Sequence, residues 1–435
     1  MKTIINKITT LSLGATLIFA SCTKEYKNPN AASQPDVFAS PKGITGVAVS
    51  LQRTYSLTVH SSMMSSCALS TNEALIVNVG NVSEALLFNG GASVDGNNGL
   101  IGSVWISNCK LIYDANTVID AAVKNIPDAA YRSGVIAYAS IFKALGYGNL
   151  SMYWENVPDT IGAPVSSPST FINRTQGYTK AVATIDRALA FIAASPISST
   201  FISDIPAGVD IVNTLQALKA RYALYAGNIA VAAAAASVVD ITKTSLLTYD
   251  ALNPNPVFIN VTSSNNVYQP IDSTLGLPLA LRPALTDARI PFYTTIATST
   301  PRYRMNGFWN TSTRSIPIYL PDEVRLIRAE CLLRQSTPDA AAAKTIIDAI
   351  LQQAPASDPL GVGANIAAGY TGTVDVPSLL DEVYRNRCIE LFMSTNKMED
   401  IRRFGRPNSE TKRKNFPYPF RERDNNPNTP TDPVF

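Results

Sequence analysis

Apolar residues recur at helical spacing in segments that come in pairs, and this pairing limits the possible folds more than any other feature of the sequence. In residues 105–124, the side chains that share one helical face are Trp105, Ile112, Ala115, Ile119 and Val123, as a period near 3.6 residues requires. A Pro-Asp break at 127–128 is followed by a second helical segment over residues 131–147. Each stripe must be buried against a partner, so we predict an antiparallel helical hairpin.

The same pattern is repeated along the chain. Two further hairpins are predicted where the Gly227-Asn228 pair and the Ser336-Thr337-Pro338 cap separate helical segments. The other predicted helices, with these, cover residues 43–55, 176–193, 213–226, 229–239, 322–334, 339–352, 377–393 and 397–404. Hairpins that recur at roughly 34 residues are typical of tetratricopeptide-like units. The predicted fold class is therefore all-α, with a tetratricopeptide-like scaffold of helical hairpins.

Two segments lack this periodicity, and we predict that both are rich in loops. Residues 58–100 contain serine pairs, Asn89-Gly90-Gly91 and a run from Asp95 to Gly99, a density of turn formers that indicates a long loop region. Residues 245–318 contain eight prolines and short β-branched patches. We interpret this second segment as an irregular lobe on the helical scaffold, whose aromatic residues are expected to be exposed: Tyr268, Phe292, Tyr293, Tyr303, Phe308 and Trp309.

The first 22 residues have the layout of a secretory signal. Lys2 and Lys7 precede an uncharged run over residues 8–20, which is too short to span a bilayer as a helix. Small residues then lead directly to Cys22, as in the lipidation box of bacterial lipoproteins. The alternative is an ordinary signal in which the cysteine is incidental. We predict a signal peptide over 1–21, a lipidated tether over 22–40 and a single body over 41–435.

Composition excludes some classes of function. Hydrophobic residues make up 46% of the chain and the net charge is +3, which falls to about +1 without the two lysines of the leader. Such a chain has no electrostatic reason to bind nucleic acid. Outside the leader, Cys67, Cys109, Cys331 and Cys388 form no CxxC pair and no metal-ligand pattern with His60, the single histidine. Disulfide bonds among these four cysteines stay an open question.

Motifs near the C-terminus follow one another in a recognisable order. The chain reads E-V-Y-R-N-R-C-I-E over 382–390, M-E-D-I-R-R-F-G over 398–405, N-F-P-Y-P-F-R-E over 415–422 and N-P-N over 426–428. This order resembles the closing signature of SusD/RagB-type outer-membrane lipoproteins of Bacteroidetes. That signature comprises an R-R-x-E-L helix, a D-L-R-R-W/F helix, a P-x-P-x-x-E stretch and a final N-P.

The resemblance extends toward the N-terminus. Residues 105–123 resemble the family's W-x(6–7)-Y-x-x-N helix, with Tyr113 and Asn116 in place, and residues 153–158 resemble its Y-G-D-V-P turn. One departure is clear, because the usual E-G-x-R between the last two helices reads M-S-T-N-K over 393–397.

The resemblance implies a non-catalytic glycan-binding subunit. Members of this family lie on a SusC-like TonB-dependent transporter, capture oligosaccharides or in some cases peptides, and deliver them to it. It implies lipid anchoring at Cys22 in the outer membrane, facing the cell exterior, and no cofactor. The alternatives are a peptide- or protein-binding lipoprotein and a glycoside hydrolase. No GxSxG, HExxH or phosphate-binding glycine loop occurs in the sequence, although two carboxylates suffice for a glycosidase.

Neutral glycans bind to aromatic faces, with amides and carboxylates on their hydroxyls. By position, the candidate ligand-binding residues are Trp309, Tyr303 and Phe308 in the lobe, and Asn89, Asp95, Asn97 and Asn98 in the first irregular segment. Trp309 has an alternative role in filling the seam between lobe and scaffold, and Asn97 and Asn98 an alternative role as turn formers. No metal site is predicted, because Asp95-Gly96-Asn97 lacks the other ligands of a calcium loop.

Three further groups are interpreted as structural. Trp105 and Trp154 lie within scaffold motifs, and His60 has no acid or nucleophile pattern around it. The C-terminal basic residues either contact a partner or anionic lipid, or pair with scaffold acids such as Glu382, Glu390, Glu399 and Asp400, and we favour pairing. These basic residues are Arg402, Arg403, Arg406, Lys412, Arg413, Lys414, Arg421 and Arg423.

Overall fold

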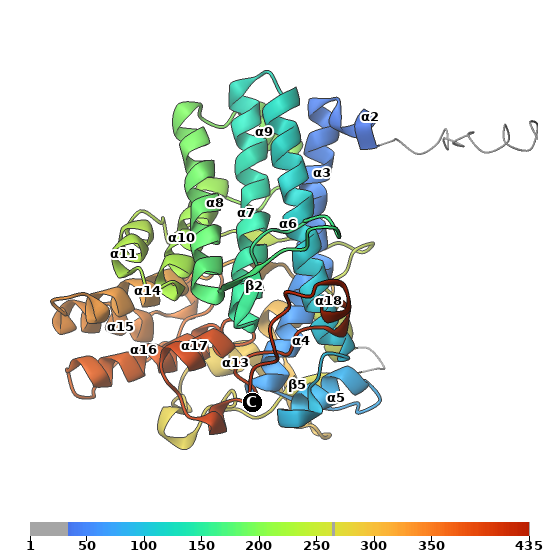
Figure 1. The fold of residues 1–435 in the computed structure, drawn as a ribbon. Helices are drawn as coiled ribbons and strands as arrows, with labels where there is room; N and C mark the ends of the chain where they lie inside the picture. The colour runs from blue at the N-terminus through green and yellow to red at the C-terminus, as the bar shows by residue number, and fades with distance from the viewer. Residues whose placement is uncertain (1–33, 263–265, 435) are drawn as a thin grey trace, which may run out of the picture.

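The computed structural model describes residues 34–262 and 266–434, so Cys22 lies outside the described residues. Long helices stand side by side in the upper half of the molecule, and α14 to α16 extend to one side below them (Figure 1). The N-terminal helices are α2 (Gln34–Phe38), α3 (Pro41–Thr54), α6 (Gly99–Asn125), α7 (Ala129–Tyr153), α8 (Arg174–Ala194) and α9 (Ser199–Asp204). The later ones are α10 (Ile211–Tyr225), α11 (Ile229–Ser237), α14 (Pro321–Arg334), α15 (Ala340–Gln352), α16 (Val376–Glu390) and α17 (Lys397–Arg403).

The predicted helical hairpins are confirmed. α6 packs on α7, α10 on α11 and α14 on α15, while α7 also packs on α8. Local capping sets where the helices start: Asp128 accepts hydrogen bonds from two backbone N–H groups at the start of α7. The predicted cap of α15 is wrong by a few residues. Asp339 caps that helix, because it directly precedes it and accepts from the Ala342 N–H at 2.9 Å.

Residues 58–100 contain two α-helices, so the prediction of a loop across this segment is wrong for residues 60–70 and 82–89. A π-helical turn, η1 (Tyr55–Val59), joins α3 to α4 (His60–Ser70), and α5 (Val82–Asn89) and the 3-10 turn η2 (Gly91–Ser93) follow. Nearly all of α4 is buried, so it has no polar face to produce a helical periodicity. Its serines resemble turn formers in sequence, but Ser65 and Ser66 donate to carbonyls one turn earlier.

The segment 245–318 is an irregular lobe of short elements. Three antiparallel strand pairs involve it: β1 (Ala74–Ile76) with β5 (Tyr268–Pro270), β4 (Leu246–Leu247) with β8 (Ile316–Pro317), and β6 (Thr294–Ile296) with β7 (Tyr303–Met305). The short helices are α12 (Pro256–Thr262), η3 (Leu279–Leu281), α13 (Arg289–Tyr293) and η4 (Gly307–Trp309). A fourth pair, β2 (Asn156–Pro158) with β3 (Phe171–Asn173), closes a loop over residues 159–170.

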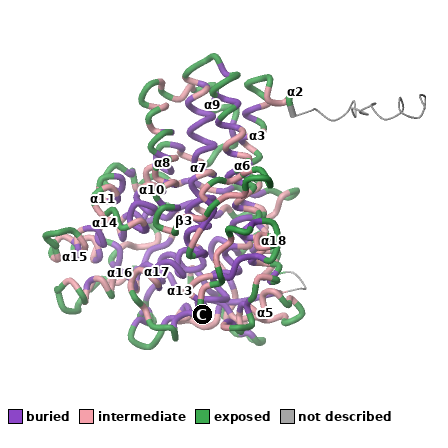
Figure 2. The backbone as a smooth tube through the Cα atoms, viewed as in Figure 1, coloured by how far each residue is buried: buried purple, intermediate pink, exposed green. Residues whose placement is uncertain are grey.

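The main core surrounds α7, which is buried along most of its length (Figure 2). The C-terminal segment, with η5 (Pro355–Ser357), η6 (Asn408–Glu410) and α18 (Phe420–Asn425), returns to this core. Trp154 donates to the Pro417 carbonyl at 2.9 Å and Trp105 to Glu422 at 3.0 Å. The two indoles also contact each other edge to face, which confirms their structural role.

Most of the C-terminal arginines pair with acids of the scaffold. Arg402 contacts Glu399, and Arg403 contacts Glu330 and Asp400. Arg406 contacts Asp381 and Glu410, and Arg423 contacts Asp432. Two of the acids that were predicted to pair with the C-terminal basic residues have other partners: Glu382 pairs with Arg385, and Glu390 pairs with Arg289.

The four described cysteines are free thiols: Cys67, Cys109, Cys331 and Cys388. Among the described helices, none is both long enough and apolar enough to cross a membrane.

Candidate functional site

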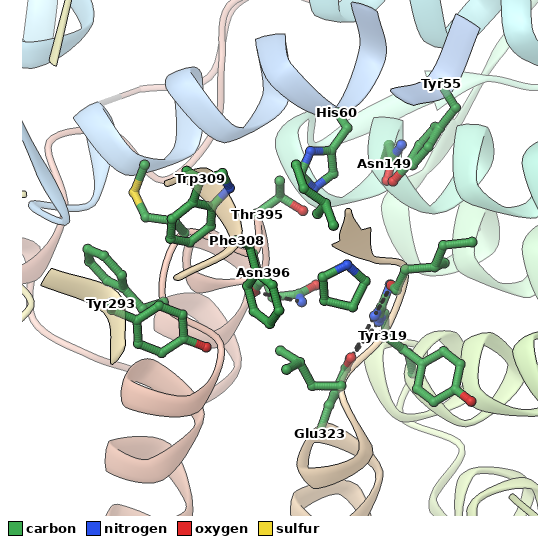
Figure 3. Close-up of a pocket in the computed structure, with 18 residues that line it drawn as sticks. Tyr55, His60, Asn149, Tyr293, Phe308, Trp309, Tyr319, Glu323, Thr395 and Asn396 are labelled. Atoms are coloured by element: carbon green, nitrogen blue, oxygen red, sulfur yellow. Dashed lines mark hydrogen bonds and ion pairs between the residues drawn. The ribbon is translucent and has the colours of Figure 1, made fainter. Parts of the chain in front are cut away.

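A small internal cavity lies at the seam between lobe and scaffold (Figure 3). His60 of α4 and Asn149 of α7 line it from the scaffold, Phe308 and Trp309 of η4 line it from the lobe, and the segment after α16 contributes Thr395. Its free volume is about 30 Å³. Such a volume accommodates water but not a sugar ring.

Trp309 and Phe308 are 2% and 4% exposed, so the expectation of exposed aromatics is wrong for both, and also for the buried Tyr268 and Tyr293. The Trp309 ring stacks on Tyr293 with centroids 5.9 Å apart. An irregular segment does not pack on neighbouring helices as a regular element would, so large aromatic rings fill the space between them. Trp309 therefore occupies the seam between lobe and scaffold, as its alternative role requires.

Polar groups on the other side of the cavity are mostly fixed by one another. Arg221 donates to both carboxylate oxygens of Glu323 at 2.6 Å and to the Ile318 carbonyl at 3.1 Å, a bidentate pair that strengthens both contacts. Burial, and then the charge of Arg221, lowers the pKa of His60 to about 4. The imidazole is therefore neutral at physiological pH.

Two polar atoms of the cavity wall have no protein partner in the described part of the chain, His60 Nδ1 and Trp309 Nε1. Buried groups of this kind are usually satisfied by water. In the part of the chain that the structure covers, no group of three His, Cys, Asp or Glu side chains is arranged to hold a metal ion. The cavity has the character of a packing seam rather than a ligand site.

The polar candidates in the turn before α6 have different environments. Asn98 is buried and its side chain accepts from the Leu100 and Ile101 N–H groups, so it is the N-cap of α6 and matches its alternative role. Asp95 and Asn97 are exposed, although the Asn97 N–H donates to Asp95 Oδ1 at 2.9 Å. Asn89 is exposed at the end of α5.

An aromatic residue that sequence reasoning missed lies against this turn. The Phe420 N–H donates to the Gly96 carbonyl at 2.9 Å, and Phe420 is 54% exposed. A Cβ on Gly96 would lie 2.5 Å from the Tyr418 carbonyl oxygen, so glycine permits this close approach. We call Asp95, Asn97 and Phe420 the α18 platform. The sequence signal that could have identified this platform is Phe420, an aromatic residue that directly follows the P-Y-P stretch and begins a short helix.

Tyr303 lies elsewhere, in strand β7. It is half-buried and its cross-strand partner is Ile296, which is largely exposed. The strand packs beside β5, where Gln269 accepts from the Met305 N–H. Sequence-predicted candidates therefore occupy four places: the internal cavity, the end of α5, the turn beside α18, and the β6–β7 hairpin.

Comparison with solved structures shows the fold. A SusD homolog from Bacteroides thetaiotaomicron has a TM-score of 0.71 at 13% identity, covering 93% of this chain and 99% of that one. A SusD-like carbohydrate binding protein from Bacteroides fragilis has a TM-score of 0.65 at 16% identity, covering 85% and 87%. A laminarin binding SusD-like protein has a TM-score of 0.60 at 14% identity, covering 91% and 99%. No family model matches the sequence, and no curated protein matches it.

Proposed function

Because this chain has the SusD-like fold, we propose that it captures oligosaccharides at the cell surface without cleaving them. The observation that carries the proposal is the end-to-end match to structures described as SusD-like and carbohydrate binding, one of them laminarin binding. The match includes most of both chains.

We place the ligand at the α18 platform. A sugar ring packs its C–H face on an aromatic ring while amides and carboxylates bind its hydroxyls. Phe420, Asp95 and Asn97 supply these groups within one exposed surface, connected through the Gly96–Phe420 hydrogen bond. Tyr303 and Asn89 are further exposed or half-exposed candidates. Trp309, Phe308 and Asn98 are buried, so they would affect ligand binding only by stabilising the structure around the site.

The delivery step is part of the same proposal. The chain would be lipidated at Cys22 and held in the outer membrane, where a SusC-like TonB-dependent transporter receives the ligand. Cys22 precedes α2 by about a dozen residues, a covalent reach of at most about 40 Å. The body would therefore stay close to the membrane surface and to any partner embedded in it.

A binding screen with the purified mature chain tests this function. We expect one class of oligosaccharide to bind, as measured by calorimetry, and to be recovered uncut by chromatography after prolonged incubation. Phe420→Ala and Asn97→Ala should each weaken binding about fivefold, since a stacking or hydrogen-bonding contact contributes on the order of 1 kcal/mol. Leu252→Ala, at an exposed site in the loop before α12, is the matched control.

The outcomes separate the alternatives. Binding of peptides and of no glycan would favour the peptide-binding function. Shortened oligosaccharide products that increase with protein concentration would indicate a hydrolase and contradict the proposal.

A further inference from the structure

Accessible aromatic rings are rare on this molecule. Among the described residues, the aromatic side chains classed as exposed are Tyr113, at 51%, and Phe420, at 54%. Phe420 belongs to the α18 platform, whereas Tyr113 lies on the outer face of α6. These two rings are the most accessible ones that the described part of the chain offers to a ligand that binds by stacking.

Tyr113 lines a surface groove between α2, α3 and α6. The groove has a volume of about 380 Å³, and its walls combine apolar and hydroxyl-bearing side chains: Val37, Phe38, Val47, Ser50, Lys110, Tyr113, Asp114 and Thr117. Lys110 and Asp114 form an ion pair with each other. The groove therefore offers hydrogen-bonding groups without an excess of either charge.

A second groove lies along the same helix, toward α18. It has a volume of about 220 Å³ and is lined by Cys109 of α6, by the loop between β2 and β3, and by α18 residues that include Glu422 and Asn425. The Glu422 carboxylate accepts hydrogen bonds from Trp105 Nε1 and Asn426 Nδ2. The carboxylate is thus held in place by neutral donors and the other lining residues are uncharged, so this groove also suits a neutral, hydroxyl-rich ligand.

The two grooves meet at the Tyr113 ring. Gly162, which lines the second groove, has φ +85°, and a Cβ there would lie 2.7 Å from Tyr113 Cδ2. The loop backbone therefore packs on the ring and limits its movement. Only a glycine permits both this backbone conformation and this close approach.

We propose that the outer face of α6 is a binding track for a neutral oligosaccharide several units long, running from the α18 platform past Gly162 to the Tyr113 groove. This inference rests on the proposed function and adds the length and charge class of the ligand. Phe420 is hydrogen-bonded to Gly96, just before α6 begins at Gly99, and the helix rises about 21 Å from Gly99 to Tyr113. One sugar ring could not contact both exposed aromatics, whereas an extended chain could.

The test compares oligosaccharides of one bound class at increasing length, from disaccharide to hexasaccharide, by calorimetry with the mature chain. We expect wild-type affinity to rise at least tenfold over this series. Tyr113→Ala should abolish the gain, so that the hexasaccharide binds no more tightly than the disaccharide. Tyr113→Phe, which keeps the ring, should retain the gain, and Leu252→Ala is the surface control.

Each other result has a defined meaning. Equal wild-type affinity for short and long chains, or a Tyr113→Ala variant that binds the hexasaccharide as wild type does, would overturn the track and leave saccharide capture intact. A requirement for uronate or sulfate groups would overturn the neutral class. Absence of binding to every glycan would overturn the proposed function itself, and the track with it.

Discussion

Some charged side chains of this protein are buried in its interior. Asp322 and Glu390 are both buried near the lobe–scaffold seam, and Asp322 Oδ2 and Glu390 Oε1 have no partner in the described part of the chain. Arg325 donates to Asp322 and Arg289 to Glu390. Burial, opposed by Arg325, raises the pKa of Asp322 to about 6. Burial and the neighbouring Asp322 also raise the pKa of Glu390.

A pH-dependent loss of stability follows for Asp322. Its folded pKa lies above the unfolded value, so its stabilisation is complete below about pH 4 and is lost as the pH rises through about 6. The asparagine side chain in Asp322→Asn cannot ionise, and the stability lost with the Arg325 contact does not depend on pH in this range. The free energy of unfolding of the variant, relative to wild type, should therefore rise between pH 4.5 and 7 by on the order of 2 kcal/mol.

Urea unfolding across this pH range measures the difference. Asp186→Asn, at a half-exposed carboxylate paired with Lys219, is the control and should show a much smaller change. A relative stability of Asp322→Asn that is flat with pH would mean that Asp322 ionises normally.

At the scale of elements, close packing around α7 depends on small residues at specific positions. Gly148 faces α10, and a Cβ there would lie 2.1 Å from Tyr222 Cζ. The obstacle is a buried ring with no free end that could move aside. By contrast, Gly102 of α6 has no heavy atom within 4 Å of an added Cβ. The two glycines have the same intrinsic helix propensity, but an added Cβ meets an obstacle only at Gly148.

Alanine substitution should therefore act in opposite directions at these two positions. Gly148→Ala should lower the free energy of unfolding by about 1–3 kcal/mol, because overpacking exceeds the gain in helix propensity. Gly102→Ala should raise it by about 0.5–1 kcal/mol. Thermal and urea denaturation of both variants provides the comparison, and equal effects would contradict the packing argument.

At the scale of the whole molecule, the body is a helical scaffold with a lobe fixed to it by buried rings and ion pairs. Tyr293 donates to the Glu390 carbonyl at 2.5 Å and stacks on Trp309. Arg289 of the lobe contacts Asp287 and Glu390. These contacts connect lobe and scaffold closely, so surface grooves rather than the seam remain open to a ligand.

The proposed membrane attachment concerns the whole chain and is tested at Cys22. Cys22→Ala should move the protein from the outer-membrane fraction to the soluble fraction, because the acyl chains that would anchor it are attached to that thiol. Cell fractionation and the intact mass of the mature chain measure this. Cys109→Ser, which changes a described thiol on α6, should stay membrane-bound. Continued membrane attachment of Cys22→Ala would contradict lipid anchoring at this residue.

Local patterns predicted much of the scaffold. The stripe of Trp105, Ile112 and Ala115 recurs at helical spacing, and Asp128 provides a cap next to its own helix, so neighbouring residues suffice to specify α6 and α7. The ordered C-terminal motifs indicated the SusD-like fold that the solved structures share. Local patterns failed for α4, where burial on all sides removes the periodicity that identifies an amphipathic helix.

The sequence by itself determined most of the scaffold helices, how they pair and which family they resemble, because propensity, caps and periodicity act between neighbours. Only the tertiary structure decided which aromatics are accessible. Trp309 and Phe420 both follow irregular, turn-rich sequence, yet one fills the seam and the other is exposed. Their exposure depends on segments far away along the chain, such as Phe392, just after α16, for Trp309 and the turn over residues 95–98 for Phe420. No local pattern records such contacts, because burial is a property of the assembled core.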